Sequence, residues 1–468
     1  MTEPGTKSAP REPGFWLALL PVLCLVALLF VQIRLFGGPA HLPLILASLV
    51  AAVAGSFLGY TWEEIEGGIR QGIEIALKAI LILMVIGILI GTWIASGIVP
   101  VLIDYGLRLL SPGYFLLAAC LVCAVVSVAT GSSWTTAGTV GIALIGVGEG
   151  LGIDSGMTAG AVVSGAYFGD KMSPLSDTTN LAPAVAGSEL FEHIQYMMYT
   201  TVPSLLIALA LFGWLGWSAE HAAIDDSQIV AIRSLLAESF HLSPVLLLVP
   251  AAVIAAVSLR VPALPALMGG ALLGGLTALL VQGTSLEQVL EVAYGGFVAD
   301  TGSPVVDELL TRGGLDSMMS TVALVLCALT FGGVMERTGC LRALAEAVLR
   351  LARSTGSLVL ATVASCIGTN VIAPDQYLSI IVPGRMYRET FLNRRLHPKL
   401  LSRTLEDAGT MSSALVPWNT CGAFMSASLA VPTMAYLPYA FLNLLTPVVA
   451  VVIAFSGFRI AKLPEEGR

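Results

Sequence analysis

Apolar segments of bilayer length follow one another along almost the whole 468-residue chain. A transmembrane helix needs about 20 predominantly apolar residues. Ten segments of about that length cover residues 15–36, 41–60, 73–97, 157–186, 194–217, 242–259, 263–282, 316–336, 404–431 and 438–457. Only 12% of the residues are charged, against about 25% in a soluble domain. The sequence therefore predicts an all-α polytopic membrane protein.

Polar residues interrupt this apolar background at four places. Two interruptions lie inside the predicted helices 157–186 and 404–431, and two lie in further apolar stretches at 114–149 and 355–383. The interruptions cover residues 130–136, 170–180, 369–376 and 407–419. An ionisable group in such a segment costs roughly 2.5–3.5 kcal/mol and usually marks an ion pathway. Because a broken helix is tolerated only against protein or a water-filled cavity, we expect the four breaks to converge.

Basic residues predict how the chain crosses the membrane. The loops 337–354 and 384–403 hold 4 and 6 of the 23 Lys and Arg residues, and short loops rich in these residues lie on the cytoplasmic side. The stretch 355–383 between them must therefore enter and return as a re-entrant hairpin. The flanks of 114–149 carry few basic residues, so we expect this second hairpin to enter from the opposite side.

The two halves of the chain repeat one order of segments. Each half has two plain helices, a third helix, a hairpin, a polar-centred helix and a closing helix, and residues 91–97 correspond to 333–339. Five spans in each half force the second half to insert upside down. The sequence thus predicts an inverted repeat of two five-helix halves, each with a re-entrant hairpin and an interrupted helix, as in secondary transporters. The expected divisions are a cytoplasmic tail at 1–14, a first repeat at 15–217, an extracytoplasmic linker at 218–241, a second repeat at 242–457 and a cytoplasmic tail at 458–468.

The polar breaks supply the candidate ion-binding side chains. Carboxylate, hydroxyl and amide oxygens suit a small hard cation. The candidates for binding a cation or a proton are Asp177, Asp170, Asp407, Asp375, Ser132, Ser133, Thr178, Thr179, Asn180, Asn370 and Asn419. We expect Asp177, with Thr178 and Asn180, to bind Na+, because a continuous helix over 157–186 would place Asp177 deeper than Asp170.

Several charged residues allow a second interpretation. Asp170 is either an ion ligand or the ion-pair partner of its neighbour Lys171. Asp407 is either the counterpart of Asp170 in the second half or part of a solvated face, since basic residues lie just before it. Glu74 and Lys78 are four residues apart on a predicted helix and are expected to neutralise each other.

Residues 169–180, Gly-Asp-Lys-Met-Ser-Pro-Leu-Ser-Asp-Thr-Thr-Asn, resemble a motif of the NhaC family of Na+/H+ antiporters, within the ion transporter superfamily. Residues 131–134 and 406–420 are similar to this family as well, and the resemblance extends over about residues 70–455. It implies the fold and the cation coupling of the family. It does not imply the substrate, because relatives exchange Na+ and malate against H+ and lactate, or carry amino acids.

The leading function is exchange of Na+ for H+ by alternating access at a shared carboxylate site. The alternative is a Na+- or H+-coupled carrier of a small organic anion or amino acid, such as a malate/lactate exchanger. A buried arginine in the core would favour that alternative, and the four breaks contain none. An intramembrane aspartyl protease using Asp170 and Asp177 is disfavoured, because its Gly-x-Gly-Asp pattern is absent; no enzyme activity is expected.

The expected location is the bacterial inner (plasma) membrane, with many passes and both termini in the cytoplasm. The expected partners are Na+, H+ and the lipid bilayer, with no nucleic acid and no cofactor. The oligomeric state stays open, a homodimer included.

Overall fold

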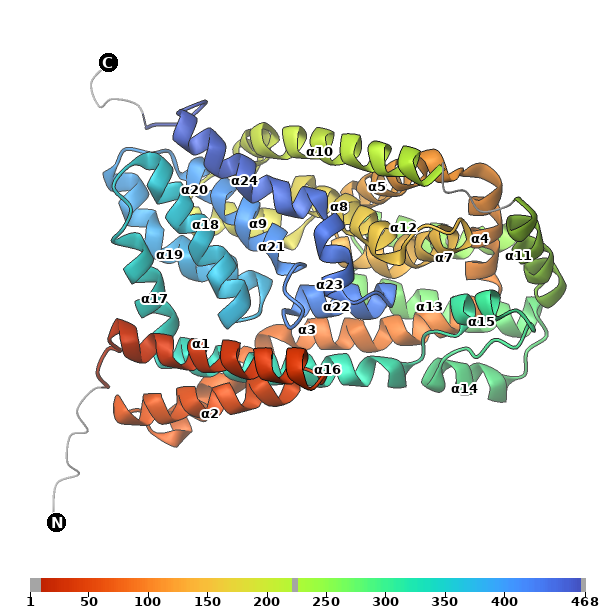
Figure 1. Cartoon of the computed structure of the whole chain (residues 1–468), viewed down its shortest axis with the longest axis horizontal. Helices are drawn as coiled ribbons and strands as arrows, with labels where there is room; N and C mark the ends of the chain where they lie inside the picture. The colour runs from red at the N-terminus through yellow and green to blue at the C-terminus, as the bar shows by residue number, and fades with distance from the viewer. Residues whose placement is uncertain (1–9, 221–225, 464–468) are drawn as a thin grey trace, which may run out of the picture.

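The computed structural model of the protein describes residues 10–220 and 226–463 and consists of helices (Figure 1). Within these ranges the only β structure is two isolated bridges, Phe297 with Arg312 and Leu396 with Lys462. The all-α prediction is therefore confirmed. The predicted tails 1–14 and 458–468 and the linker 218–241 lie partly outside the described residues, at 1–9, 464–468 and 221–225.

Seven helices in the described part of the chain are long and apolar enough to cross a membrane, or nine spans if two bent helix pairs are counted. The seven are α1 (Phe15–Leu29) with its π-helical continuation η1 (Phe30–Leu35), α3 (Trp62–Ala95), α5 (Pro112–Thr130), α10 (Leu190–Glu220), α13 (Ala263–Val281), α16 (Leu315–Arg337) and α18 (Thr355–Ile372). The bent pairs are α11 (Asp226–Ser239) with η3 (Pro244–Leu247) and α12 (Leu248–Ser258), and α22 (Thr420–Leu429) with α23 (Thr433–Tyr436) and η5 (Leu437–Tyr439). The protein is thus a polytopic membrane protein.

The remaining elements are mostly shorter. They are α2 (His41–Phe57), α4 (Ile98–Leu109), α6 (Ser133–Thr136), η2 (Ala137–Gly141), α7 (Ile142–Gly150), α8 (Ser155–Met172), α9 (Asp177–Ala186), α14 (Leu286–Gly295), α15 (Pro304–Leu310), α17 (Cys340–Leu349), α19 (Gln376–Asn393), α20 (Pro398–Leu405), η4 (Glu406–Thr410), α21 (Met411–Ser413) and α24 (Phe441–Ser456). The ten predicted spans differ from this set because 157–186 and 404–431 break into separate helices, while α12 has only 11 residues.

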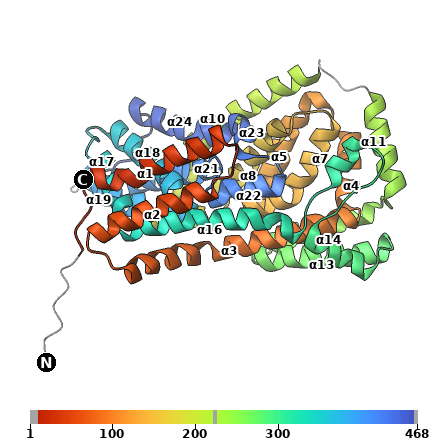
Figure 2. The ribbon, with the colours of Figure 1, turned by 60° about the horizontal axis from the view of Figure 1, so that its bottom comes forward.

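Glycines allow the long helices α3 and α16 to pack closely, side by side in Figure 2. A Cβ atom on Gly72 would lie 3.1 Å from the carbonyl oxygen of Leu329, and one on Gly333 would lie 2.5 Å from that of Gly68. Small residues at such contacts are typical of helix packing in membranes. These glycines therefore let the backbones of α3 and α16 come into direct contact.

Gly97 and Gly339 adopt corresponding conformations after these two helices. Their φ angles are 79° and 75°, in the left-handed region that favours glycine, and each directly precedes a short helix, α4 or α17. The segment before 114–149 and the predicted loop 337–354 thus contain helices, α4 and α17. The pair falls at the ends of the corresponding segments 91–97 and 333–339.

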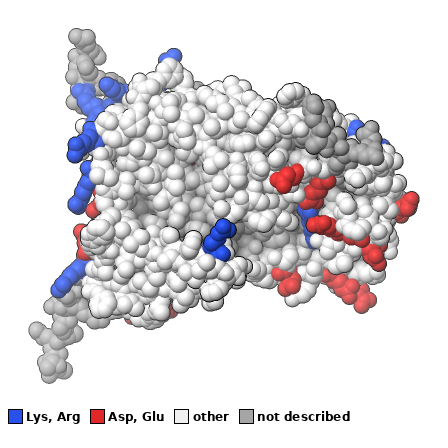
Figure 3. All heavy atoms as spheres, in the orientation of Figure 1, with Lys and Arg blue, Asp and Glu red and all other residues white. Residues whose placement is uncertain are grey.

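Charged residues separate to opposite ends of the molecule. Lys and Arg gather at the end where α17 and α19 lie, whereas Asp and Glu gather at the end with α11, α14 and α15 (Figures 1 and 3). We call these the basic end and the acidic end. Helices α18 and α19 pack together toward the basic end, and α5 to α7 lie toward the acidic end.

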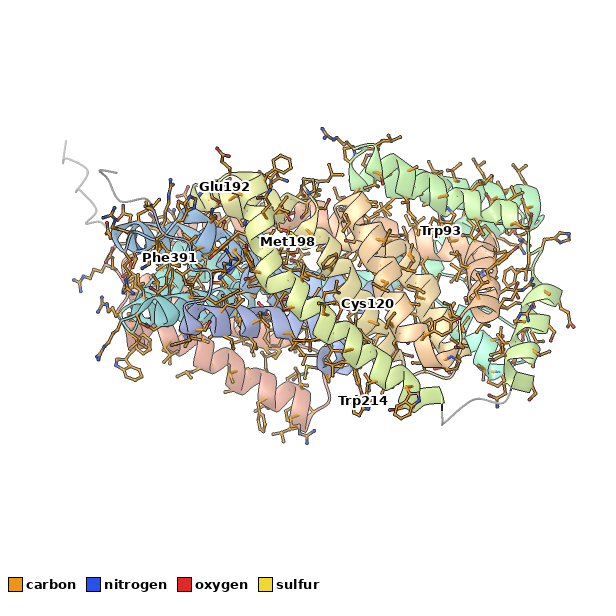
Figure 4. All side chains as sticks on the ribbon, turned by 90° about the horizontal axis from the view of Figure 1, so that it is seen from above. Trp93, Cys120, Glu192, Met198, Trp214 and Phe391 are labelled. Atoms are coloured by element: carbon orange, nitrogen blue, oxygen red, sulfur yellow. The ribbon has the colours of Figure 1, made fainter. Side chains whose placement is uncertain are left out.

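The buried apolar side chains also divide between these ends. One cluster includes Trp93 and Cys120, and a second includes Phe391, at the other side of the molecule in Figure 4. Helix α10, with Met198 and Trp214, passes over the outside of both regions (Figure 4). The fourth break contributes to both clusters, with Met411 and Ala414 in the first and Ala408 in the second.

Candidate ion-binding site

Three of the four predicted breaks line one cavity of about 620 Å³. The lining residues are Thr130, Gly131, Ser132 and Trp134 of the first break, Asp170, Pro174, Leu175, Asp177 and Thr178 of the second, and Asp375 and Gln376 of the third, with Tyr377 directly after the third and Thr420 and Cys421 directly after the fourth. Helix α3 and the turn between α12 and α13 complete the wall. The first three breaks thus converge as expected, whereas the fourth reaches the cavity only through the residues that follow it.

The first break ends helix α5 and directs two serines toward the site. Gly131 has a φ of 68° and lies against Leu175 of the second break, where a Cβ would overlap the backbone. Ser132 then caps helix α6, its hydroxyl accepting a hydrogen bond from the Thr135 amide at 3.1 Å. The next hydroxyl, that of Ser133, donates to Asp170 Oδ2 at 2.6 Å. Side-chain caps of this kind stabilise a helix start.

The second break separates Asp170 from Asp177. Asp170 lies near the end of α8, is 7% exposed, and accepts a second hydrogen bond from Ser176 Oγ at 2.6 Å. Asp177 begins the next helix, α9, with a side chain that is 61% exposed. The expectation that Asp177 lies deeper is therefore wrong, because helix α8 ends at Met172 and Asp177 begins the separate helix α9 at an exposed position.

Asp177 forms an ion pair with Lys78 of α3 at 3.0 Å and accepts a hydrogen bond from Tyr377 Oη at 3.3 Å. The expected Glu74–Lys78 pair is thus replaced by a pair between distant segments. Both members of the new pair are solvent-accessible at the cavity, where water screens their attraction.

The amides and one threonine of the candidate set bind backbone oxygens of the breaks. Asn180 donates to the carbonyls of Pro174 at 2.9 Å and Ser176 at 2.7 Å. Thr179 donates to the carbonyls of Asp170 and Lys171, both at 2.9 Å. Backbone groups freed by a break in lipid need such partners. These two side chains hold the second break in shape and do not line the cavity.

Asn370 and Asn419 connect the third and fourth breaks. Asn370 Nδ2 donates to the Gly409 carbonyl at 2.7 Å, and Asn419 Nδ2 donates to Asn370 Oδ1 at 3.0 Å. Asp375 caps helix α19, accepting from the amides of Tyr377 at 2.9 Å and Leu378 at 3.1 Å. Asp375 is buried and lines the cavity, whereas both asparagines lie behind its wall.

Asp407 lies away from the cavity in a fully buried cluster of charges. Lys171 forms an ion pair with it, Thr200 Oγ1 donates to it at 2.9 Å, and Arg403 Nε lies 3.5 Å from its second oxygen. All three charged side chains are 0% exposed. The solvated-face interpretation of Asp407 and the Asp170–Lys171 pair are both wrong: Lys171 points from the first half of the chain to the second.

Two functional candidates were missed from the sequence. Glu406 is 0% exposed and accepts a hydrogen bond from Thr178 Oγ1 at 3.0 Å; its position beside Asp407 in an apolar segment was the available signal. Arg260, at the turn between α12 and α13, lines the cavity. No local pattern distinguishes it, because only the packing of that turn brings it near the breaks. The four breaks themselves contain no arginine, and Arg260 is exposed at the cavity.

Within the described ranges, no group of three or more His, Cys, Asp or Glu side chains is arranged to hold a metal ion. The cavity instead offers single carboxylates beside hydroxyls, such as Asp170 near Ser132 and Thr178. A single carboxylate with hydroxyl neighbours would bind a cation weakly enough to release it again, as ion conduction requires.

Broken helices that meet at one polar cavity in a membrane protein are typical of secondary transporters. The chain belongs to the Na+/H+ antiporter family, whose model matches residues 15–170 and 165–458. Membership of a transporter family excludes the protease alternative, and it confirms the resemblance to the NhaC family.

Three relatives match nearly the whole chain. The Na+/H+ antiporter NhaC of Alkalihalophilus pseudofirmus is 42% identical over 96% of both chains. The arginine/ornithine antiporter ArcD of Halobacterium salinarum is 39% identical over 97% of this chain and 95% of its own. The malate-2H+/Na+-lactate antiporter of Bacillus subtilis is 36% identical over 90% of each. Among solved structures, the YdaH transporter of Alcanivorax borkumensis is similar at a TM-score of 0.39 and 13% identity, covering 94% of this chain and 99% of that one.

Proposed function

We propose that the protein exchanges Na+ for H+ by alternating access, with Asp170 as the carboxylate that binds either ion. The observation that carries this proposal is the setting of Asp170: a buried carboxylate at the cavity wall with two serine hydroxyls at 2.6 Å. A buried charge needs a compensating charge. Either a proton or Na+ supplies it, so binding of one ion displaces the other.

The surrounding oxygens suit a small cation. Ser132 and Thr178 share the cavity wall with Asp170, and Asp375 adds a second carboxylate to the lining. Hard cations prefer such oxygen ligands. The exposed Asp177–Lys78 pair is then an entry point for the cation and not its main site, because Lys78 already neutralises that carboxylate.

We further propose that the two halves, 15–217 and 242–457, are inverted repeats, with the basic end and both chain termini in the cytoplasm of a bacterial inner membrane. The positive-inside rule supports the sidedness. Three pairs of features support the repeat: Gly97 with Gly339, the two predicted hairpins near opposite ends, and the helices α9 and α22 at the second and fourth breaks. Helices α9 and α22 have ten residues each and begin at side-chain caps, Ser176 and Asn419.

Transport by purified protein in liposomes tests the function. An internal pH indicator should report proton movement when Na+ or Li+ is added, without any organic substrate. Asp170→Asn should abolish this signal in protein that inserts and elutes normally, since a neutral amide neither releases a proton nor balances a cation. Unchanged proton movement in that variant would contradict the assignment of Asp170.

Carriage of a small organic anion or amino acid together with a cation is a second candidate. Arg260 at the cavity favours it, because it has no ion-pair partner among the described residues. The volume of about 620 Å³ is also far larger than a bare ion requires, and the N-termini of α9, α19 and α22 at the cavity favour anionic groups. Proton movement that requires malate, lactate or an amino acid, and that Arg260→Gln removes, would select this candidate.

A further inference from the structure

We propose that one proton is stored on a buried chain of four side chains, Asp170, Ser176, Thr178 and Glu406, and moves along it between the two carboxyl groups. The inference rests on the proposed ion exchange and adds the path of the proton and a second proton-carrying residue, Glu406. The chain begins at the cavity wall with Asp170 and ends in the second half of the protein.

The four side chains form three consecutive contacts. Ser176 Oγ lies 2.6 Å from Asp170 Oδ1, 3.1 Å separates Ser176 Oγ from Thr178 Oγ1, and Thr178 Oγ1 lies 3.0 Å from Glu406 Oε1. All four residues are buried, with exposures of 7% or less. The chain crosses from α8, through the start of α9, to η4. It therefore joins a first-half break to a second-half break.

The number of protons follows from the number of contacts. Three hydrogen bonds in series need three protons, and the two hydroxyls supply only two. When both carboxyls are ionised, Ser176 donates to Asp170 and Thr178 donates to Glu406, so the contact between the hydroxyls has no proton. One proton added at either carboxyl completes all three hydrogen bonds.

The chain with this one proton has two arrangements. When Asp170 holds the proton, the Asp170 carboxyl donates to Ser176, Ser176 donates to Thr178, and Thr178 donates to Glu406. When Glu406 holds the proton, all three hydrogen bonds point the other way. In passing from the first arrangement to the second, each hydroxyl gives up its proton to the next oxygen and receives one from the previous oxygen. The O–H bond at Asp170 breaks and one forms at Glu406, so one proton is transferred in net and the number of protons is unchanged.

The charges around the chain lead to the same count. Lys171, Arg403 and Asp407 are fully buried beside it. Together with Asp170 and Glu406 they make two cations and three carboxyls, which are neutral as a group when one proton is bound. Burial of an uncompensated charge is costly. The other ionisable side chains near the chain are Tyr167 on α8, Asp177 on α9, which is paired with Lys78, His193 on α10, Asp375 and Tyr377 on α19, and Cys421 on α22.

Sodium binding couples to this chain through Asp170. A Na+ at the cavity supplies the one positive charge in place of the proton, so Asp170 and Glu406 are both ionised and the proton leaves the chain. The proton load of the chain and the Na+ at Asp170 therefore alternate.

Infrared spectroscopy of purified protein tests the stored proton directly. The wild type in the absence of Na+ should show a protonated-carboxyl band that shifts in D2O and decreases when Na+ is added. Both Glu406→Gln and Asp170→Asn should alter this band, because each removes one end of the chain. A wild type without such a band, or a band unaffected by Glu406→Gln, would overturn the inference.

Transport by threonine variants tests the path. Thr178→Val keeps the shape and removes the hydroxyl, and it should slow Na+-driven proton movement by about 100-fold, the lower range for a positioned proton-transfer group. Thr178→Ser should restore the rate. The matched control is Thr362→Val, a buried threonine whose hydroxyl bonds only its own helix, at the Leu358 carbonyl. Wild-type rates in Thr178→Val would refute the path. A wild type with the infrared band but no Na+-driven proton movement would remove the proposed exchange and leave the stored proton standing.

Discussion

The ion pair between Lys171 and Asp407 is expected to connect the two halves of the protein energetically. Both side chains are fully buried, and Asp407 also accepts from Thr200 at 2.9 Å and lies 3.5 Å from Arg403. Removing one partner of a buried pair costs about 3–5 kcal/mol, because the other charge is left uncompensated. The free energy of unfolding should therefore fall markedly in either single variant.

The two single variants should lose different amounts of unfolding free energy. Lys171→Met leaves Asp407 with Arg403 and Thr200 as partners, so we expect a loss near 3 kcal/mol, the lower limit of that range. Asp407→Asn leaves two buried cations without the carboxylate between them, so we expect about 5 kcal/mol, the upper limit. The double variant removes the pair together, and its loss should be well below the sum of the two.

Reversible unfolding in mixed detergent micelles, followed by tryptophan fluorescence, measures these differences. Arg342→Ala serves as a control, because its pair with Glu346 is exposed and surface changes stay within about 0.5 kcal/mol. Losses that add in the double variant would show that the two residues do not interact. The reasoning about the buried pair would then be refuted.

Three further outcomes are expected. Asp177→Asn should weaken apparent Na+ affinity without abolishing transport, whereas Asp170→Asn abolishes it; the reverse ranking in liposome assays would return the main site to Asp177. Calorimetry between about pH 6 and 9 should show Na+ affinity falling up to tenfold per unit as pH falls, as expected for one displaced proton, and an affinity independent of pH would contradict a shared site. In a background without reactive thiols, Leu351→Cys and Leu392→Cys should label from one side of the membrane and Val298→Cys from the other; labelling of the first two from opposite sides would remove the re-entrant hairpin at 355–383.

Much of the fold could be predicted from the sequence, because its signals are local. Apolar length indicates a membrane helix, and a polar or proline-containing interruption indicates a break. The breaks at 130–136, 170–180, 369–376 and 407–419 and the convergence of the first three followed from these rules. Gly97 and Gly339 mark corresponding turns for a similar local reason, since both need a left-handed backbone.

The sequence also determined which residue types would supply the site, but only the tertiary structure decided their partners. Asp170 and Asp177 look alike in a continuous helix; with the helix broken after Met172, Asp170 is buried and Asp177 is exposed. Lys171 pairs with Asp407 across 236 residues, and Lys78 with Asp177 across 99. Ion pairs depend on which distant segments meet and which way each side chain points after a break. The local apolar pattern specifies neither the segments that meet nor the direction of the side chains. The ion-pair partners are therefore known only once the two halves are packed together.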